Sequence, residues 1–350
     1  MSGSSPSLRP NPTLLRHLAR SPAVLNVETV SYCNARCCFC PYSKMQRSKE
    51  IMSMDLYGKL VREFAEMGGG ALLLTPIVGE FFLDPHWLTR IAVAREYEQI
   101  GMISVTSNGI CLDRLRDEEL TAFLRGTNFL QISVGDTSRE EYKRMFGVDR
   151  YDRVKQNIVR LATLRNDVMP EYPLRLGFRV GSAATVTSSE DYALFRQLGY
   201  EIAVETNFGN WGGTIRRSDL PANVTLRTAP NLEEKKNPCF VFYMGLFIAA
   251  SGKATSCGCM DAEVVAQVGD CREQSLHDIW HGRRYAEIRD SFGTERMPNI
   301  CKECSFYSDG VAFAASSELA NYEVGQYPFG AKSRHVMFER PDVHRDGRGG

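Results

Sequence analysis

Short apolar runs alternate with amphipathic stretches along residues 25–208 of the chain. Runs of this length, bounded by polar and Gly-containing segments, indicate buried strands, and apolar positions three and four residues apart indicate helices. Ser53 is a typical helix cap, and Gly68-Gly69-Gly70 is a typical helix end. The expected strands are 25–30, 71–78, 102–106, 129–134, 174–180 and 202–205. The expected helices are 54–67, 87–98, 113–124, 151–164 and 191–198.

This order predicts an α/β fold with a parallel sheet, because each helix returns the chain to the same end of the next strand. Six strand–helix units are fewer than the eight that close a barrel, so we expect a partial, open (β/α)6 barrel resembling a TIM barrel. Functional residues should then follow the carboxyl ends of the strands.

The chain has 350 residues, enough for one large and one smaller domain. We expect an N-terminal extension over 1–24, the partial barrel over 25–215, a small second domain over 216–310 and a C-terminal tail over 311–350. A polar segment rich in Gly and Arg follows Pro341, so part of this tail is expected to be disordered.

Composition excludes several kinds of partner. There are 42 basic and 42 acidic residues, which gives no electrostatic case for nucleic acid or a membrane surface. Residues 1–24 lack the apolar core of a signal peptide, and no run approaches the roughly 18 apolar residues of a membrane span. We therefore expect a cytoplasmic protein, in which the 11 cysteines are metal ligands or catalytic thiols rather than disulfides.

Three cysteines follow the first expected strand. Cys33, Cys37 and Cys40 have the spacing C-x3-C-x2-C, while Cys38 lies off that spacing and is interpreted as a packing residue. Three thiolates leave one position of a tetrahedral site, or one iron of a cluster, for a ligand that is not protein. A zinc site is the alternative, but a structural zinc would need a fourth nearby ligand.

Placed after the first strand of a six-fold series, this triplet resembles the radical S-adenosylmethionine (SAM) superfamily. Residues 76–81 after the second strand resemble the Gly-Gly-Glu-Pro motif of that family, with Val78 and Phe81 in place of its first glycine and its proline and with Glu80 retained. Residues 106–109 resemble its SAM-contacting loop, and residues 132–136 its Ser-x-Asp-Gly segment with the last two residues exchanged.

The resemblance implies SAM and a SAM-binding [4Fe-4S] cluster as cofactors. It implies that Glu80 receives the SAM amino group, that Ser107 and Asn108 contact the ribose and carboxylate, and that Ser133 contacts the ribose. Arg179, at the end of the fifth strand, could pair with the SAM carboxylate. Each residue also has an ordinary structural interpretation. Glu80 could be a capping carboxylate, Ser107 and Asn108 could belong to an ordinary Asn-Gly turn, and Arg179 could form a structural ion pair.

A second cysteine set lies beyond the barrel. Cys239, Cys257 and the C-x2-C pair Cys301 and Cys304 resemble the auxiliary-cluster domain of radical SAM enzymes, called SPASM in its long form and twitch in its short form. An amphipathic helix is expected over 275–289. The resemblance implies one auxiliary [4Fe-4S] cluster closed by four thiolates, and a zinc ribbon with the same ligands is the alternative.

The remaining cysteines have no fixed role. Cys259 and Cys271 are candidates either for a buried small hydrophobe or for a thiol that returns a hydrogen atom to a product radical, and Cys111 is interpreted as buried. Asn207, Asn210 and Trp211 follow the sixth strand, where they could contact a polyhydroxylated substrate or form a linker into the second domain.

The resemblance implies an oxidoreductase or lyase of natural-product (antibiotic) biosynthesis, similar to 2-deoxy-scyllo-inosamine dehydrogenase. Its 5′-deoxyadenosyl radical would take hydrogen from a carbinol carbon of a sugar, aminocyclitol or nucleoside, with oxidation as the outcome. Decarboxylation of a sugar acid such as cytosylglucuronate, and epimerisation, are the first alternatives. A SPASM-type peptide maturase is the second, disfavoured by the short segment before the barrel. The expected partners are a small-molecule substrate and an external electron donor such as flavodoxin or ferredoxin.

Overall fold

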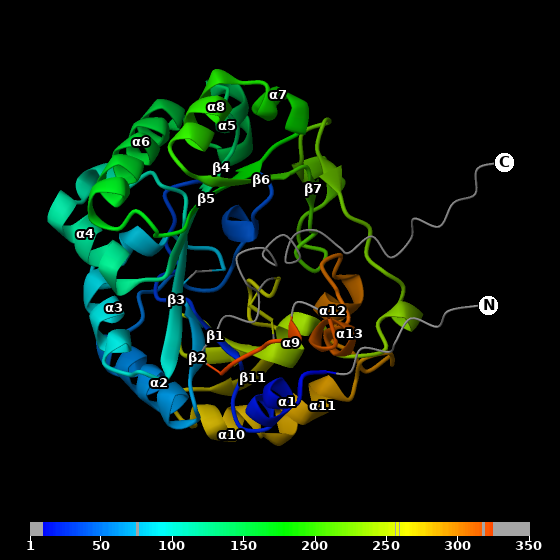
Figure 1. The fold of residues 1–350 in the computed structure, drawn as a ribbon. Helices are drawn as coiled ribbons and strands as arrows, with labels where there is room; N and C mark the ends of the chain where they lie inside the picture. The colour runs from blue at the N-terminus through cyan, green and yellow to red at the C-terminus, as the bar shows by residue number, and fades with distance from the viewer. Residues whose placement is uncertain (1–9, 75–76, 256, 259, 317–318, 325–350) are drawn as a thin grey trace, which may run out of the picture.

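The computed structural model describes residues 10–74, 77–255, 257–258, 260–316 and 319–324. Its strands form an open, curved sheet whose outer face is covered by α2 (Met54–Glu66), α3 (Trp87–Arg95), α4 (Asp117–Gly126) and α6 (Tyr151–Val168) (Figure 1). The concave inner face of the sheet is thus left for the functional site.

All six expected strands are present and pair in parallel, which confirms the α/β partial-barrel prediction. Consecutive strands along the chain are neighbours in the sheet, so their carboxyl ends meet along one rim. The strands are β1 (Val24–Val27), β2 (Gly70–Leu73), β3 (Ile100–Ser107), β4 (Phe129–Val134), β5 (Leu174–Arg179) and β6 (Glu201–Glu205).

Local signals explain where α2 begins and ends. The Ser53 hydroxyl accepts a hydrogen bond from the Leu56 amide at 3.3 Å, as expected for an N-cap. The chain leaves the helix through Gly68, Gly69 and Gly70, whose φ angles are all positive. A Cβ on Gly70 would lie 2.6 Å from the Ala23 carbonyl oxygen, so only glycine lets this turn approach β1 so closely.

Several helices differ from the prediction. The residues from 113 do not continue into α4, because a single 3₁₀ turn precedes a separate start at Asp117. The helix expected over 275–289 is two helices, and the chain turns between them at Gly282. Only glycine fits at this turn, because a Cβ there would lie 2.5 Å from the Asp278 carbonyl oxygen. Short helices that the sequence pattern missed are α1 (Pro12–Leu18), α5 (Arg139–Phe146), α7 (Ala183–Thr187), α9 (Phe240–Met244), α12 (Asn299–Glu303) and α13 (Gly310–Ala314).

The remaining elements are short. The predicted helices near 191–198 and 275–289 correspond to α8 (Glu190–Gln197), α10 (Leu276–Trp280) and α11 (Arg283–Arg289). The 3₁₀ turns are Pro41–Ser43, Phe81–Leu83, Leu112–Arg114, Arg217–Asp219 and Leu232–Glu234. A separate two-stranded parallel sheet pairs β7 (Asn207–Phe208) with β8 (Thr225–Leu226).

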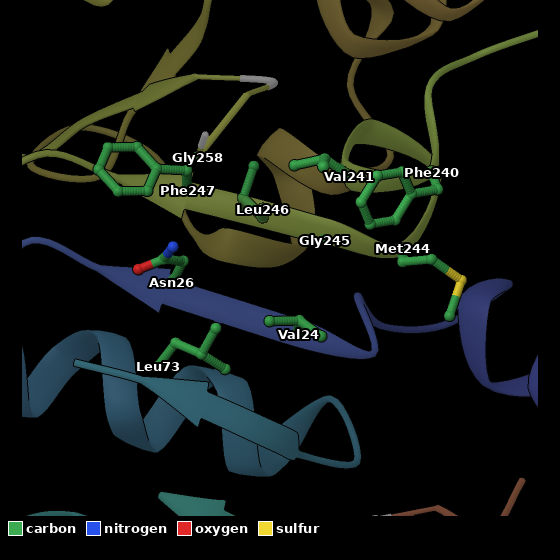
Figure 2. Close-up of a pocket in the computed structure, with 10 residues that line it drawn as sticks. All are labelled: Val24, Asn26, Leu73, Phe240, Val241, Met244, Gly245, Leu246, Phe247 and Gly258. Atoms are coloured by element: carbon green, nitrogen blue, oxygen red, sulfur yellow. The ribbon is translucent and has the colours of Figure 1, made fainter. Parts of the chain in front are cut away.

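The second cysteine region extends the barrel sheet instead of forming a sheet of its own. Strand β9 (Gly245–Ile248) pairs in parallel with β1, with Val24 opposite Gly245 and Val27 opposite Ile248. Strands β10 (Lys253–Thr255) and β11 (Gln267–Asp270) continue it as antiparallel neighbours, giving one nine-stranded sheet. Figure 2 shows β9 beside β1, with Phe240 and Met244 of α9 at one end. The expected boundary near residue 215 therefore divides the sequence without dividing the sheet.

The expected N-terminal extension is folded against both the barrel and the last described segment. The Asn11 side chain donates a hydrogen bond to the Ala320 carbonyl at 2.9 Å. His17 of α1 lies between the Gly69 carbonyl, 3.0 Å from Nε2, and the Tyr322 hydroxyl, 2.6 Å from Nδ1. The predicted disorder after residue 341 falls outside the described residues. Within those residues, no helix is long and apolar enough to cross a membrane.

A fully buried ion pair holds the segment that follows β2. Arg90 and Asp84 are both excluded from solvent, with 2.5 Å between Arg90 Nε and Asp84 Oδ2. Arg90 also donates to the Met52 carbonyl, and its own carbonyl accepts from the Tyr57 hydroxyl at 3.0 Å. The pair thus joins α2, α3 and the turn that carries Glu80.

We expect Arg90→Met to lower the free energy of unfolding by about 3–5 kcal/mol, because it leaves the Asp84 charge buried and unpaired. Urea and thermal unfolding of the variant measure the loss. Arg62→Met, on the exposed face of α2, is the matched control and should change stability little. Equal stability of the two variants would contradict a structural role for the pair.

Candidate functional site

The cysteine triplet lies in a loop between β1 and the Pro41–Ser43 turn. Backbone amides of this loop bind the end of α5: the Arg36 N–H donates to the Phe146 carbonyl and the Cys38 N–H to the Met145 carbonyl, both at 2.9 Å. The Cys38 sulfur also contacts the Met145 sulfur at 4.0 Å. Cys38 is therefore held as a packing residue, as its off-pattern position suggested.

The other three thiols share one neighbourhood. Burial raises the pKa of Cys33 to about 12 and that of Cys40 to about 11. The pKa of Cys37 is also raised, first by burial and then by the nearby Cys40 and Cys33 thiols. Three adjacent soft donors fit an iron–sulfur cluster. Among the described residues, no group of three or more His, Cys, Asp or Glu side chains is arranged to hold a single metal ion.

Glu80 is buried beside the triplet at the end of the turn after β2. Its carboxylate accepts hydrogen bonds from the Ser107 hydroxyl at 2.6 Å, the Asn108 amide at 2.7 Å and the Phe82 amide at 3.3 Å. Burial raises its pKa, and these three donors act in the opposite direction. The sequence-predicted residues of β2 and β3 are thus joined in one network.

Asn108 connects this network to the triplet loop. Its side-chain amide donates to the Asn34 side-chain oxygen at 2.7 Å and lies 3.8 Å from the Cys33 sulfur. The backbone after it turns through Gly109 at φ 72°. The Asn-Gly pair therefore makes the ordinary turn that the sequence allowed, and it also places a polar side chain at the triplet.

Arg179, at the end of β5, faces the same cysteines. Burial lowers its pKa, while the nearby Glu205 carboxylate and the Cys37 and Cys40 thiols act in the opposite direction. In the strand register Arg179 lies opposite Glu205, the last residue of β6. Glu205 in turn accepts a hydrogen bond from Arg227 at 2.7 Å, and both side chains are largely buried.

One cavity of about 270 Å³ brings these groups together. Its lining includes all of the residues predicted to contact the SAM-binding cluster or SAM, namely Cys33, Cys37, Cys40, Glu80, Ser107, Asn108, Ser133 and Arg179. The lining continues over the end of β6 and over later segments, with Glu205, Asn207, Phe208, Trp211, Arg227, Met260 and Phe306. This volume is close to the lower end of the range of small-molecule pockets, roughly 300–1,000 Å³.

A smaller cavity of about 40 Å³ is lined by residues of β1, β2, β9 and α9 (Figure 2). Its lining is mainly apolar, with Val24, Leu73 and Leu246 among the contributing residues. Asn26, Leu73 and Gly258 line both cavities, so the two adjoin. Of these two cavities, only the larger is lined by thiol and charged groups, so it is the candidate functional site.

The second cysteine set gathers beside the larger cavity. Burial raises the pKa of the Cys239 thiol, of Cys301 and of Cys304, the last to about 12. Cys304 and Cys239 both act on Cys301, and Cys239 acts on Cys304, so these three thiols are neighbours. Cys257 packs against the apolar cluster that includes Cys304 and that Cys239 also contacts. Three neighbouring soft donors are the ligand type of an iron–sulfur cluster.

Not every candidate reaches the site. Cys271 is fully buried in the apolar core and does not line the cavity, so the structure gives it no access to a substrate. Cys111 is also buried in that core, as expected. Cys259 lies outside the described residues.

The segment after β6 turns out to connect the two cysteine loops. Asn210 donates to the Glu303 carbonyl at 2.7 Å and accepts from the Ser305 amide at 3.0 Å, next to Cys304. The Trp211 indole N–H donates to the Phe39 carbonyl in the triplet loop at 2.7 Å. Trp211 and Asn207 line the cavity, whereas Asn210 does not. Of the two roles considered for Asn210, substrate contact and linker, the structure thus favours the linker.

Three charged residues of the site were missed. Glu205 could have been found, because it ends the sixth expected strand, where functional residues are expected. Arg227 and Lys235 carry no such signal, since each lies in an irregular segment. Lys235 is buried beside the second cysteine set and donates to the Cys301, Lys302 and Cys304 carbonyls.

We expect Asn210→Ala to lower the free energy of unfolding by about 1–3 kcal/mol, because its side chain makes the hydrogen bonds to Glu303 and Ser305. Thermal unfolding of the purified chain measures the loss. Asn166→Ala, an exposed position on α6, is the control. If both variants unfold at the wild-type temperature, the segment does not hold the cysteine loops together.

Two family profiles match the chain at these two regions. Residues 27–173 match the Radical SAM superfamily, and residues 239–305 match SPASM, an iron–sulfur cluster-binding domain. Among curated proteins, a GTP 3′,8-cyclase of Chlorobaculum tepidum is 26% identical over 148 residues. That match covers 42% of this chain and 43% of the relative, so it spans less than half of either protein.

Solved structures share the fold at low sequence identity. BtrN in complex with AdoMet and 2-DOIA is 18% identical, with a TM-score of 0.55 over 83% of this chain and 95% of that one. SuiB of Streptococcus suis bound to the precursor peptide SuiA is 14% identical, with a TM-score of 0.60 over 89% of this chain and 78% of that one. The anSMEcpe structure with bound AdoMet is also 14% identical, with a TM-score of 0.54 over 91% and 96% of the chains.

The matched regions contain the two cysteine sets, and the expected cofactor classes, SAM and iron–sulfur clusters, are confirmed at the level of these domains. Likeness to the solved structures extends to the parallel sheet and the second cysteine region, which confirms the fold class. Residues 27–173 therefore form a radical SAM domain, and residues 239–305 form a SPASM iron–sulfur cluster-binding domain.

Proposed function

We propose that this enzyme removes hydrogen from a carbinol carbon of a sugar, aminocyclitol or nucleoside and oxidises that carbon. The carrying observation is one cavity of about 270 Å³, in which the SAM-type residues form one part of the wall and a charged and aromatic surface forms the other. SAM bound at such a cluster supplies a 5′-deoxyadenosyl radical that can abstract hydrogen from an unactivated carbon.

Residues at or beyond the carboxyl ends of β1 to β5 hold the cofactor. Cys33, Cys37 and Cys40 bind the SAM-binding cluster and leave one iron open. The Glu80 carboxylate, fixed by Ser107 and the Asn108 amide, accepts the SAM amino group. Each carboxylate oxygen can accept two hydrogen bonds, so Glu80 can accept from the SAM amino group and keep its present hydrogen bonds.

Other polar groups of the same rim complete the SAM site. The Arg179 guanidinium pairs with the SAM carboxylate as a charge-assisted contact. Ser133, which lines the cavity at the end of β4, contacts the ribose. Phe39 packs against Phe208 with 5.1 Å between ring centres, and Arg179 lies over the Phe39 ring at 5.3 Å. These rings keep water from the reacting carbon.

The remaining wall suits a substrate with hydroxyl groups. Trp211, Phe306 and Met260 offer an apolar face on which a ring can stack. Glu205 lies in the same wall, and its carboxylate is the group that takes the hydroxyl proton during oxidation. Burial raises the pKa of Glu205, which makes the carboxylate a better base, while Arg227 acts in the opposite direction. The ion pair with Arg227 also fixes the orientation of the carboxylate.

The second cysteine set supports oxidation over a redox-neutral outcome. Cys239, Cys257, Cys301 and Cys304 close one auxiliary [4Fe-4S] cluster with four thiolates, a ligand set that suits electron transfer. An external donor such as flavodoxin or ferredoxin supplies the electron for SAM cleavage. Decarboxylation or epimerisation of a related substrate begins with the same hydrogen abstraction, and a peptide substrate remains the second alternative.

We expect replacement of Cys33, Cys37 or Cys40 by Ala to abolish 5′-deoxyadenosine formation, because each removes a ligand of the SAM-binding cluster. Chromatography of the products and iron analysis of anaerobically reconstituted protein are the measurements. Wild-type chain should hold about eight irons if each cluster is a cubane of four. Cys38→Ala is the control within the same loop and should retain cleavage. Continued cleavage in all three ligand variants would refute the assignment.

We expect Glu205→Gln to lower product formation by about 100-fold or more, the usual contribution of a general base, while 5′-deoxyadenosine formation persists. The assay incubates enzyme with candidate glycosides, aminocyclitols, nucleosides and a peptide, and follows 5′-deoxyadenosine and product mass together.

The mass change separates the outcomes. Loss of two hydrogens indicates oxidation, loss of carbon dioxide indicates decarboxylation, and an unchanged mass indicates epimerisation. Glu190→Gln, exposed at the start of α8, is the control. Wild-type product yield from Glu205→Gln would exclude this carboxylate as the base.

A further inference from the structure

Lys235 is a lysine with no exposed surface, four residues before Cys239. Lysine is rarely buried in full, because its ammonium loses the hydration that stabilises the charge. Its neighbour Lys236 is exposed, as lysines usually are. The fold therefore encloses this one side chain next to the auxiliary cysteines, and its position needs a compensating interaction.

Three hydrogen bonds direct the ammonium at the C-x2-C loop. Lys235 Nζ donates to the Cys301 carbonyl at 2.8 Å, the Lys302 carbonyl at 2.7 Å and the Cys304 carbonyl at 3.0 Å. The Tyr307 ring lies 5.9 Å from the same nitrogen. These contacts fix the position of the ammonium beside the C-x2-C loop.

The bonded carbonyls belong to the ligand loop itself. Cys301 and Cys304 are two of the four proposed ligands, and Lys235 precedes a third, Cys239, by four residues. The hydrogen bonds thus hold one cation beside the proposed ligands. No exposed lysine could act on them as well, because solvent and salt screen its charge.

A cluster with four thiolate ligands carries net negative charge, and reduction adds one further negative charge. Reduction potentials of such clusters depend on the net charge and on the hydrogen bonds around the sulfurs. A buried cation stabilises the reduced form more than the oxidised form, since Coulomb energy grows with the charge it faces. The effect is largest where water is excluded, as it is around Lys235.

We propose that Lys235 is a positioning residue that raises the reduction potential of the auxiliary cluster and so favours its acceptance of an electron. The step concerned is the transfer of one electron to the cluster from the carbon radical that hydrogen abstraction leaves on the substrate, and no bond to Lys235 forms or breaks. This inference rests on the proposed auxiliary cluster but not on the proposed substrate, because the potential is a property of the enzyme alone.

The test measures the midpoint potential of the auxiliary cluster in a chain whose triplet cysteines are all replaced by Ala, so that one cluster gives the signal. Reductive titration followed by electron paramagnetic resonance is compared between the parent chain, Lys235→Gln and Lys235→Arg. Gln retains donors for the carbonyls but removes the charge, while Arg keeps the charge. Lys236→Gln, the exposed neighbour, is the matched control.

We expect the reduction equilibrium of Lys235→Gln to become less favourable by at least tenfold, which is about 59 mV for a one-electron couple. Lys235→Arg and Lys236→Gln should remain close to the parent. Iron and sulfide content is measured on every variant, so that potentials are compared at equal loading.

Two results would overturn the proposal. One is a parent-like potential in fully loaded Lys235→Gln. The other is loss of the cluster from Lys235→Gln with normal loading of Lys235→Arg, which would assign the cation to holding the loop. A parent chain without iron at the second cysteine set would instead refute the auxiliary cluster itself, independently of what Lys235 does.

Discussion

The parallel pairing of β9 with β1 is the constraint on which the rest of the structure depends. Strand β1 has β2 on one side and β9 on the other, so its backbone hydrogen bonds are shared between the barrel and the auxiliary region. The strand that delivers the chain to Cys33 is therefore central in the sheet, although it is the first strand in sequence. A central strand is held on both edges, which fixes the direction in which the cysteine loop leaves it.

A second connection acts at the rim, where the sheet ends. The segment with Asn210 and Trp211 binds the triplet loop through the Phe39 carbonyl and the C-x2-C loop through Ser305. Trp211 has φ 51°, a left-handed conformation that is unfavourable for a bulky residue. Such a conformation persists only where surrounding contacts impose it. The indole thereby lines the cavity, while its N–H donates a hydrogen bond to the triplet loop. Trp211 thus both lines the cavity and links the segment after β6 to the triplet loop.

Much of the fold could be predicted from the sequence because strands such as β1, β2 and β4 are mostly buried and read as apolar runs. The strand at 129–134 was predicted to the residue, and Ser53 was identified as the cap of α2. The break at Gly282 was missed, since it depends on the close approach of a carbonyl and leaves the apolar periodicity unchanged. The pairing of β9 with β1 was missed for a similar reason: strand order is a long-range property that periodicity does not contain.

The site shows the same division. Residues at or beyond the strand ends, such as Glu80, Ser107 and Arg179, meet at the cavity because parallel topology brings strand ends together. Arg227 and Lys235 were missed because they come from irregular segments whose course only tertiary packing determines. Cys271 has a chemically suitable side chain, but it lies after β11, on the core side of the sheet. Residue type alone could not distinguish that location from the cavity.

The Glu28–Arg47 ion pair has a consequence for how the protein opens. The Glu28 carboxylate, fully buried just beyond β1, accepts two hydrogen bonds from Arg47 at 2.8 and 2.6 Å and one from the Ala250 amide at 3.2 Å. Arg47 belongs to the segment after the triplet, and Ala250 to the β9–β10 hairpin. Local opening of either segment would remove donors from a buried charge, so we expect the segment after the triplet and the β9–β10 hairpin to open together.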